Sequence, residues 1–169
     1  MSTEQKVIGG ISLLSIVILV GGVFFLSASS SPSTSSNSNI NSATSVPESD
    51  IVARNGMHWH PKLSIYIKGE KQPFTNGIGL NGAVHNPIHT HDDADKDIVH
   101  MEFQGVVTKE DTKLASFFKI WGKKFSSTQI FDKKNGEEGT VKMTVNGKGN
   151  TQFENYQMRD GDMIEIKYE

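Results

Sequence analysis

The stretch Val141-Lys142-Met143-Thr144-Val145-Asn146-Gly147 decides how the C-terminal part of this chain is built. Apolar and polar side chains alternate along its first five residues, which is the period of a strand with one buried face. Asn146-Gly147 then signals a tight turn, and the alternation returns at Ile164, Ile166 and Tyr168. The sequence therefore predicts two strands near the C-terminus, each with one face in a core.

A helix is predicted ahead of these strands. Large apolar side chains recur there at the spacing of one helical face: Leu114, Phe117, Phe118, Trp121 and Phe125. Thr108, three residues before Asp111, precedes the pattern as a capping pair would, and Gly122 is a stop signal. A stripe of aromatic residues at helical spacing is more often core than docking surface, and we interpret it as core.

Two further strands are predicted upstream. Leu63, Ile65 and Ile67 alternate with polar residues, and the segment 98–104 repeats the pattern. In that segment Val99, Met101 and Phe103 form the core face, which leaves His100 and Glu102 on the other face. The segment 81–96, with its proline and aspartates, is predicted to be an exposed loop. The order strand, strand, helix, strand, strand predicts an α+β domain with one helix packed on a mixed sheet.

The N-terminal residues predict a membrane anchor. Val7 to Leu26 is an uncharged apolar run long enough to cross a bilayer as a helix. Lys6 precedes the run and the next basic residue is Arg54, so the positive-inside rule places residues 1–6 in the cytoplasm. A cleaved signal peptide, processed near Ser27-Ala28-Ser29, is the alternative. In both cases the rest of the chain functions outside the cytoplasm, at the cell membrane as a single-pass protein if the anchor is retained.

Composition divides the remainder into a tether and one domain. Residues 27–50 are rich in Ser, Asn and Thr and predict a flexible tether, whereas residues 51–169 suffice for one domain. The chain has no cysteine, which excludes a lipoprotein anchor and disulfides. A formal net charge of −2 gives no basic face for nucleic acid. The expected partners are the membrane and a larger membrane complex or metal acceptor.

The C-terminal tail resembles β-grasp domains such as the small sulfur-carrier proteins. The residues that carry this resemblance are Thr144-Val145-Asn146-Gly147 and Asp160-Gly161-Asp162-Met163-Ile164-Glu165-Ile166. The resemblance implies a β-grasp-like mixed sheet with one main helix on one face. The chain ends in Lys167-Tyr168-Glu169 without a terminal Gly-Gly, so sulfur transfer is not carried over.

Most of residues 57–168 is also similar to a little-characterised group of membrane-tethered archaeal and bacterial proteins rich in histidine. The matching motifs are His89-Thr90-His91-Asp92, Ile98-Val99-His100-Met101-Glu102, Phe118-x-x-Trp121-Gly122 and Asp160-Gly161-Asp162. This resemblance implies a shared histidine site and brings no established activity.

The histidines are the strongest functional signal. All of them lie within one segment of 43 positions, and they are His58, His60, His85, His89, His91 and His100. Imidazole is the commonest side-chain ligand for zinc, copper and iron. In an extended chain the two histidines of a His-x-His pair point the same way and can share one ion. We therefore predict a metal site, on the sheet face away from the helix.

Carboxylates near the histidines are predicted to assist them. Glu102 shares a strand face with His100 and is expected to orient a ligand or to act as a general base. Among the aspartates at 92, 93, 95 and 97, Asp92 is the best candidate to orient an imidazole, and the others are interpreted as solvated charges. Without cysteine, a blue-copper centre and a tetrathiolate zinc site are excluded, which leaves copper(II) and zinc as equal candidates.

The sequence supports three functional hypotheses. The first is a membrane-anchored, extracytoplasmic domain that captures, buffers or delivers copper or zinc. The second is a metalloenzyme in which histidines hold the ion and Glu102 is the base. The third is a β-grasp interaction module of a membrane complex, with incidental or pH-sensing histidines.

Overall fold

A computed structural model describes residues 46–169, and residues 1–45 are not among the described residues. The predicted membrane helix and most of the predicted tether therefore fall on residues that are not described. None of the helices formed by residues 46–169 has the length and apolar character needed to cross a membrane. The last residues of the predicted tether form a short 3-10 helix, η1 (Glu48–Asp50).

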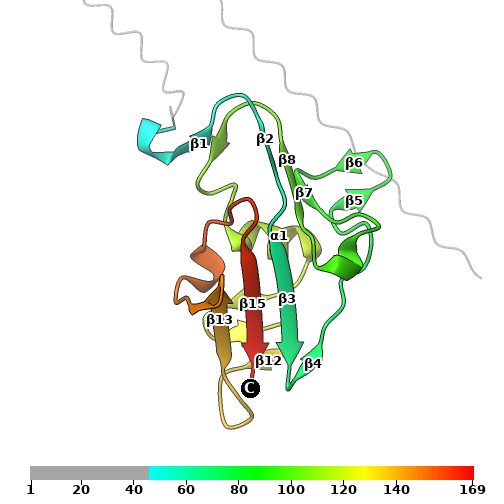
Figure 1. Ribbon diagram of the computed structural model, residues 1–169, viewed down its shortest axis with the longest axis vertical. Helices are drawn as coiled ribbons and strands as arrows, with labels where there is room; N and C mark the ends of the chain where they lie inside the picture. Colours follow the sequence, from blue (N-terminus) through cyan, green and yellow to red (C-terminus); the bar gives the residue numbers. More distant parts are fainter. Residues whose placement is uncertain (1–45) are drawn as a thin grey trace, which may run out of the picture. The chain divides into compact units, whose positions relative to one another are not determined.

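The described residues form an α+β domain made mostly of strands with one α-helix, as the periodicity predicts (Figure 1). Its main sheet has five strands in the order β14-β13-β15-β3-β4. The strands are β3 (Lys62–Ile67), β4 (Glu70–Lys71), β13 (Val141–Val145), β14 (Lys148–Gly149) and β15 (Met163–Tyr168). The two longest, β15 and β3, are parallel, and the other pairs are antiparallel.

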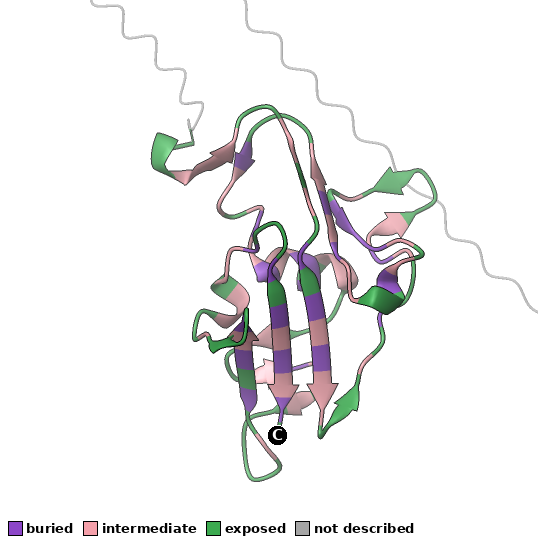
Figure 2. Ribbon diagram, viewed as in Figure 1, coloured by how far each residue is buried: buried purple, intermediate pink, exposed green. Residues whose placement is uncertain are grey.

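Alternation along these strands places one face in the core. Leu63, Ile65, Ile164 and Ile166 are buried, while the residues between them are partly exposed (Figure 2). Each such buried side chain contributes about 1.5–3 kcal/mol relative to an exposed one. The predicted buried faces of the strands at 63–67, 141–145 and 164–168 are thus confirmed.

The predicted helix is α1 (Leu114–Trp121), and its aromatic stripe lies in the core. Gly122 ends it with a φ of 70°, which a residue without Cβ adopts freely. Thr108 and Asp111 are hydrogen-bonded to each other, but they form a turn ahead of the helix, which begins only after Lys113. Phe125 lies beyond the helix, where its ring stacks on Phe118 with centroids 4.6 Å apart.

The predicted second strand belongs to a different sheet. The strand β8 (His100–Phe103) is the centre of a three-stranded antiparallel sheet in the order β2-β8-β7, with β2 (Met57–Trp59) and β7 (Ile88–His89) as its edges. The strand that pairs with the outer edge of β3 is β4, not β8. Lys68 and Gly69, both with positive φ angles, form a tight turn directly after β3 and bring β4 back alongside it. Figure 1 shows the three-stranded sheet at the end of the main sheet where β3 begins.

The segment 81–96 is more ordered and more buried than predicted. It contains β6 (Val84–His85), β7 and a 3-10 helix, η2 (Ala94–Lys96). Ile88, His89 and Thr90 are buried because β7 pairs with β8, so the expectation of an exposed loop is wrong for these residues. The remaining short elements are β1 (Ile51–Ala53), β5 (Leu80–Asn81), β9 (Val107–Thr108), β10 (Phe125–Ser126), β11 (Gln129–Ile130), β12 (Lys133–Lys134) and η3 (Phe153–Asn155).

Candidate metal centre

The register of the three-stranded sheet brings polar side chains to one of its faces. His58 on β2 lies opposite Glu102 on β8, and His89 on β7 lies opposite His100 on β8. The adjacent Ile88 and Met101 point to the other face and are buried. The histidine site is therefore on the β2-β8-β7 sheet rather than on the five-stranded sheet, because β8 pairs with β2 and β7 and not with β3.

His85, His89 and His91 form the first histidine triad. The Nε2 atom of His89 lies 3.2 Å from Nε2 of His85 and 2.9 Å from Nε2 of His91. The side chain of His89 is fully buried, whereas His85 is exposed and His91 partly exposed. A zinc ion with bonds of about 2.05 Å in tetrahedral geometry holds its ligand atoms about 3.3 Å apart. Two of the three separations thus match those of ligands to one ion, and the ligand atoms of all three residues lie within 4.8 Å of one another.

The protonation state of His89 favours this role. Its Nδ1 atom donates to the backbone carbonyl of Asn86 at 2.9 Å, so its Nε2 atom carries a lone pair that faces the other two rings. This single lone pair can accept one N–H donor, yet two ring nitrogens approach it. A cation at the common point would satisfy all three nitrogens at once.

The middle residue of the His89-Thr90-His91 motif anchors the triad. The hydroxyl of Thr90 donates to the carbonyl of Thr75 at 2.8 Å and accepts from the N–H of Ile78 at 3.0 Å. Thr90 is fully buried, and its side chain points into the domain. The side chains of His89 and His91 point the opposite way, and their rings lie next to each other. Sequence reasoning treats this threonine as a spacer, but its two hydrogen bonds fix the motif in place.

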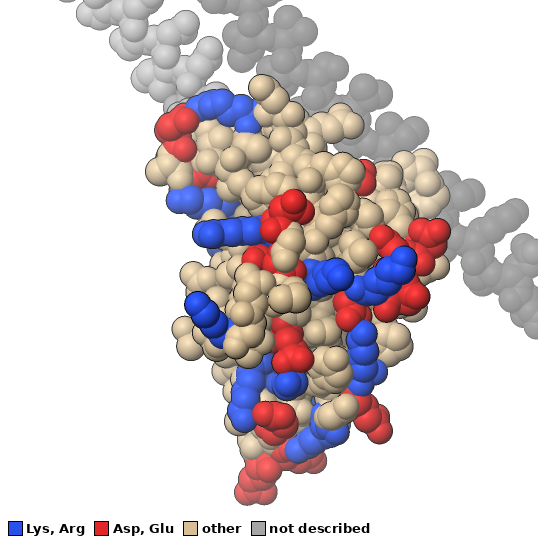
Figure 3. All heavy atoms as spheres, viewed as in Figure 1, with Lys and Arg blue, Asp and Glu red and all other residues tan. Residues whose placement is uncertain are grey.

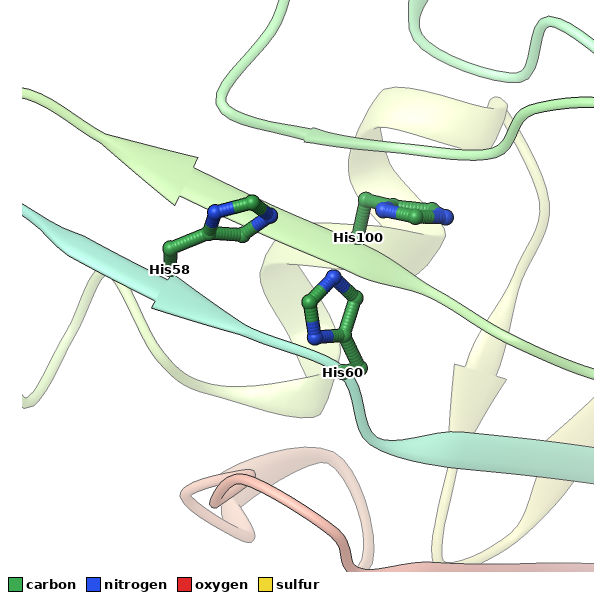
Figure 4. Close-up of side chains that lie close together, drawn as sticks. All are labelled: His58, His60 and His100. Atoms are coloured by element: carbon green, nitrogen blue, oxygen red, sulfur yellow. The ribbon is translucent and has the colours of Figure 1, made fainter.

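His58, His60 and His100 form the second histidine triad. The ring of His60 has its centroid 4.6 Å from that of His58 and 4.9 Å from that of His100. Figure 4 shows the three rings on the same side of the β2–β8 pair, with His60 just beyond the end of β2. The backbone N–H of His60 donates to Asp160 at 2.8 Å, so the turn before β15 positions this ligand.

An aspartate orients His100. Its Nε2 atom lies 3.1 and 3.2 Å from the two carboxylate oxygens of Asp93, which accept its proton. The Nδ1 atom of His100 is then the lone-pair atom, and it is buried without a hydrogen-bond partner. A buried polar atom without a partner costs about 1–3 kcal/mol, and a metal ion would supply that partner. The carboxylate that contacts this imidazole belongs to Asp93, whereas the sequence favours its neighbour Asp92.

Glu102 lies between the two triads. Its Oε1 atom is 3.2 Å from Nε2 of His58 in the second triad and 3.9 Å from Nδ1 of His100 in that same triad. The same oxygen is 3.9 Å from Nε2 of His89 in the first triad. Ligand atoms of His91, His100 and Glu102 also lie within 4.8 Å of one another, which joins the triads into one array.

Burial governs the electrostatics of the array. Loss of solvation lowers the pKa of His89, and the nearby imidazoles of His85 and His91 lower it further, although the hydrogen bond that His89 donates to the carbonyl of Asn86 opposes this. Burial alone would raise the pKa of Asp93, but the hydrogen bond with His100 and the charge interactions with His100 and His91 together outweigh this and lower it. A neutral imidazole and an ionised carboxylate are the forms that bind a metal cation.

The sequence identifies the histidines but not their grouping. The structure brings all six together in two triads, rather than around a single point, and His85, the one with the weakest sequence signal, is a full member of the first. Asn86, Thr90 and Asp93 are the supporting residues that sequence reasoning misses. Their position within or beside the histidine motifs is the only sequence signal for them, because their partners are chosen by the fold.

No protein-family model, no curated protein and no solved structure matches this chain.

Proposed function

We propose that this protein is a membrane-anchored, extracytoplasmic domain that binds copper or zinc for capture, buffering or delivery. One observation carries the proposal: the Nε2 atoms of His85 and His91 both lie at ligand spacing from Nε2 of a buried imidazole, His89, whose other nitrogen donates to Asn86. Pre-oriented imidazoles of this kind are what a transition-metal site requires.

The donor set supports copper(II) or zinc among the biological metals. Both triads consist of imidazole nitrogens, which suit these two ions, whereas calcium and magnesium prefer oxygen ligands. The apolar run from Val7 to Leu26 supports the membrane anchor, and the lack of basic residues between that run and Arg54 supports export of the domain. The order of the five-stranded sheet, with β15 parallel to β3 at its centre, supports a β-grasp-like domain as the carrier of the site.

A metalloenzyme is the second candidate, and one observation favours it. A pocket of about 560 Å³ opens beside Glu102 and is lined by His58 and His85, one histidine from each triad. A ligand could therefore reach an ion and a carboxylate that can act as a base. The third hypothesis, an interaction module with incidental histidines, gains no support from histidines that gather at one place.

Metal titration of the full chain, purified in detergent and freed of metal, tests the proposal. We expect Cu(II) or Zn(II) to bind stoichiometrically, and His89→Ala combined with His91→Ala to remove at least one bound equivalent. Lys96→Ala, in the neighbouring η2, is the matched control and should bind as the unmodified chain does. Failure of the unmodified chain to bind either ion, or unchanged binding by the double variant, would show that the proposal is wrong.

A further inference from the structure

On the basis of the proposed function, we infer that the histidine array holds two metal ions, one in each triad, with the carboxylate of Glu102 bridging them. The first ion is bound by His85, His89 and His91, and the second by His58, His60 and His100. This assignment goes beyond a single metal site, because it gives every donor of the array a ligand role.

The donor groups of the array outnumber the ligands that one ion takes. Six imidazoles and one carboxylate make seven donor groups, whereas a zinc ion in a protein takes four ligands and a copper(II) ion four to five in most sites. Two ions with three imidazoles each, and with Glu102 as the shared fourth ligand, give each ion four protein ligands, and a copper(II) ion can still accept a fifth ligand from solvent. A single ion on either triad would leave the three imidazoles of the other triad without a metal ion.

The position of Glu102 suits a bridge. Its Oε1 atom approaches Nε2 of His58 to 3.2 Å and Nε2 of His89 to 3.9 Å, so one oxygen is close to a ligand atom of each triad. Glu102 is on β8, the central strand, with one triad partner on each flanking strand. Its backbone N–H donates to the carbonyl of Pro87 at 2.7 Å, which fixes the strand at this position.

The triads are in contact, as a two-metal centre requires. The rings of His91 and His100, which belong to different triads, have centroids 4.6 Å apart, and those of His89 and His100 are stacked at 5.7 Å. Metal ions in two-metal sites are about 3.5–4 Å apart. The contacts between these rings bring ligands of both triads next to each other, as two ions at such a separation require.

The buried Nδ1 atom of His100 is an independent sign of the second ion. It has no hydrogen-bond partner, and its ring is held in this tautomer by Asp93 on the opposite nitrogen. In the first triad, the Nε2 atoms of His89 and His91 lie 2.9 Å from each other, so they form one ligand cluster that does not include this atom. An ion between His100, His58 and His60 would satisfy it.

Charge near the array offsets part of the charge of two dications. Glu102 lies between the triads, Asp93 contacts His100, and Asp160 accepts a hydrogen bond from the backbone of His60. Figure 3 shows further acidic side chains around η2, where the sequence places Asp95, whereas the nearby Asp97 is already paired with Lys71 at 2.7 Å. Neutral imidazoles add no positive charge of their own, so the array can accept two divalent ions.

The open side of the array would let a small anion bind to both ions. The pocket beside Glu102 is lined by His58 from one triad and His85 from the other, together with the polar side chains of Asn55 and Gln104. An exchangeable ligand in this pocket, such as water, azide or a carboxylate, can therefore reach both ions from solvent.

Copper(II) titration of the metal-free full chain, followed by electron paramagnetic resonance, tests the inference. We expect two equivalents per chain and, at the second equivalent, loss of signal intensity with a half-field transition from two coupled ions. His60→Ala and His85→Ala each remove an exposed ligand from one triad, and each should leave one uncoupled equivalent. Glu102→Gln should weaken the second equivalent about 10- to 100-fold and reduce the coupling.

The outcomes separate this inference from the proposed function. One bound equivalent in the unmodified chain, or two equivalents without magnetic coupling, would overturn the two-ion centre while leaving metal binding intact. Unchanged stoichiometry in both His60→Ala and His85→Ala would also overturn it, because neither triad would then be needed to hold an ion. Absence of any bound copper or zinc would overturn both proposals.

Discussion

Replacement of Asp93 by alanine should weaken metal binding at the second triad without unfolding the domain. Both oxygens of the Asp93 carboxylate accept from Nε2 of His100, at 3.1 and 3.2 Å. This contact fixes the tautomer in which Nδ1 of His100 is the free ligand atom. Asp93 also precedes η2, but its side chain makes no capping hydrogen bond there, so the turn does not depend on it.

The expected loss follows from the strength of this contact. The side chain of His100 is 12% exposed and that of Asp93 is 26% exposed, so solvent screens the pair only in part. Removal of a carboxylate that orients a metal-binding imidazole costs 10- to 100-fold in affinity, or about 1.4–2.7 kcal/mol. Asp93→Asn keeps an acceptor and loses the charge, so its loss should lie below that of Asp93→Ala.

Asp92→Ala is the matched control, because it removes the same group one position away. Affinity is measured by competition with a chelator of known strength, and retention of the fold by circular dichroism and Tm. We expect Asp92→Ala to bind like the unmodified chain. Equal losses in the two alanine variants, or no loss in Asp93→Ala, would refute the assignment of Asp93 as the residue that orients His100.

Three further predictions concern backbone fit and pH. In Gly79→Ala, the new Cβ would lie 2.5 Å from the carbonyl oxygen of Ile88, at a residue whose φ is +81°. This variant should lower the free energy of unfolding by about 1–3 kcal/mol, displace His89 and weaken metal binding. An unchanged Tm would contradict this prediction. Burial, with the hydrogen bond to Asp162, raises the pKa of Tyr156 to about 12, so the unfolded chain loses this proton at lower pH than the folded chain. The free energy of unfolding, measured by urea titration, should therefore fall as pH rises from 10.0 toward 12, and Tyr156→Phe should flatten this decline. Burial lowers the pKa of His89 below 6.5, so the unfolded chain takes up a proton at higher pH than the folded chain. The free energy of unfolding of the metal-free chain, measured in urea, should therefore fall as pH falls through 6.5, and the fall should be smaller in His89→Gln.

The local periodicity of apolar side chains predicts much of the fold. The alternation at 63–67, 141–145 and 164–168 and the stripe from Leu114 to Trp121 specify which faces are buried, because a strand or helix exposes one face whatever it packs against. The pairing of strands is not a local property. The reversal at Lys68-Gly69 gives β3 a nearby partner, and the segment 98–104 pairs elsewhere as a result.

Sequence by itself determined that the chain has six histidines in one segment, that His-x-His pairs point the same way, and that His100 and Glu102 share a face. It could not determine that His85 joins His89 and His91, that Asp93 rather than Asp92 contacts His100, or that Glu102 lies between two triads. Those facts depend on which strands flank β8 and on the turn at η2, and contacts between distant segments are set by the packing of the whole domain. Tertiary structure alone decided them, because residue types specify which donors are present while only the folded chain brings their atoms to within a few ångströms.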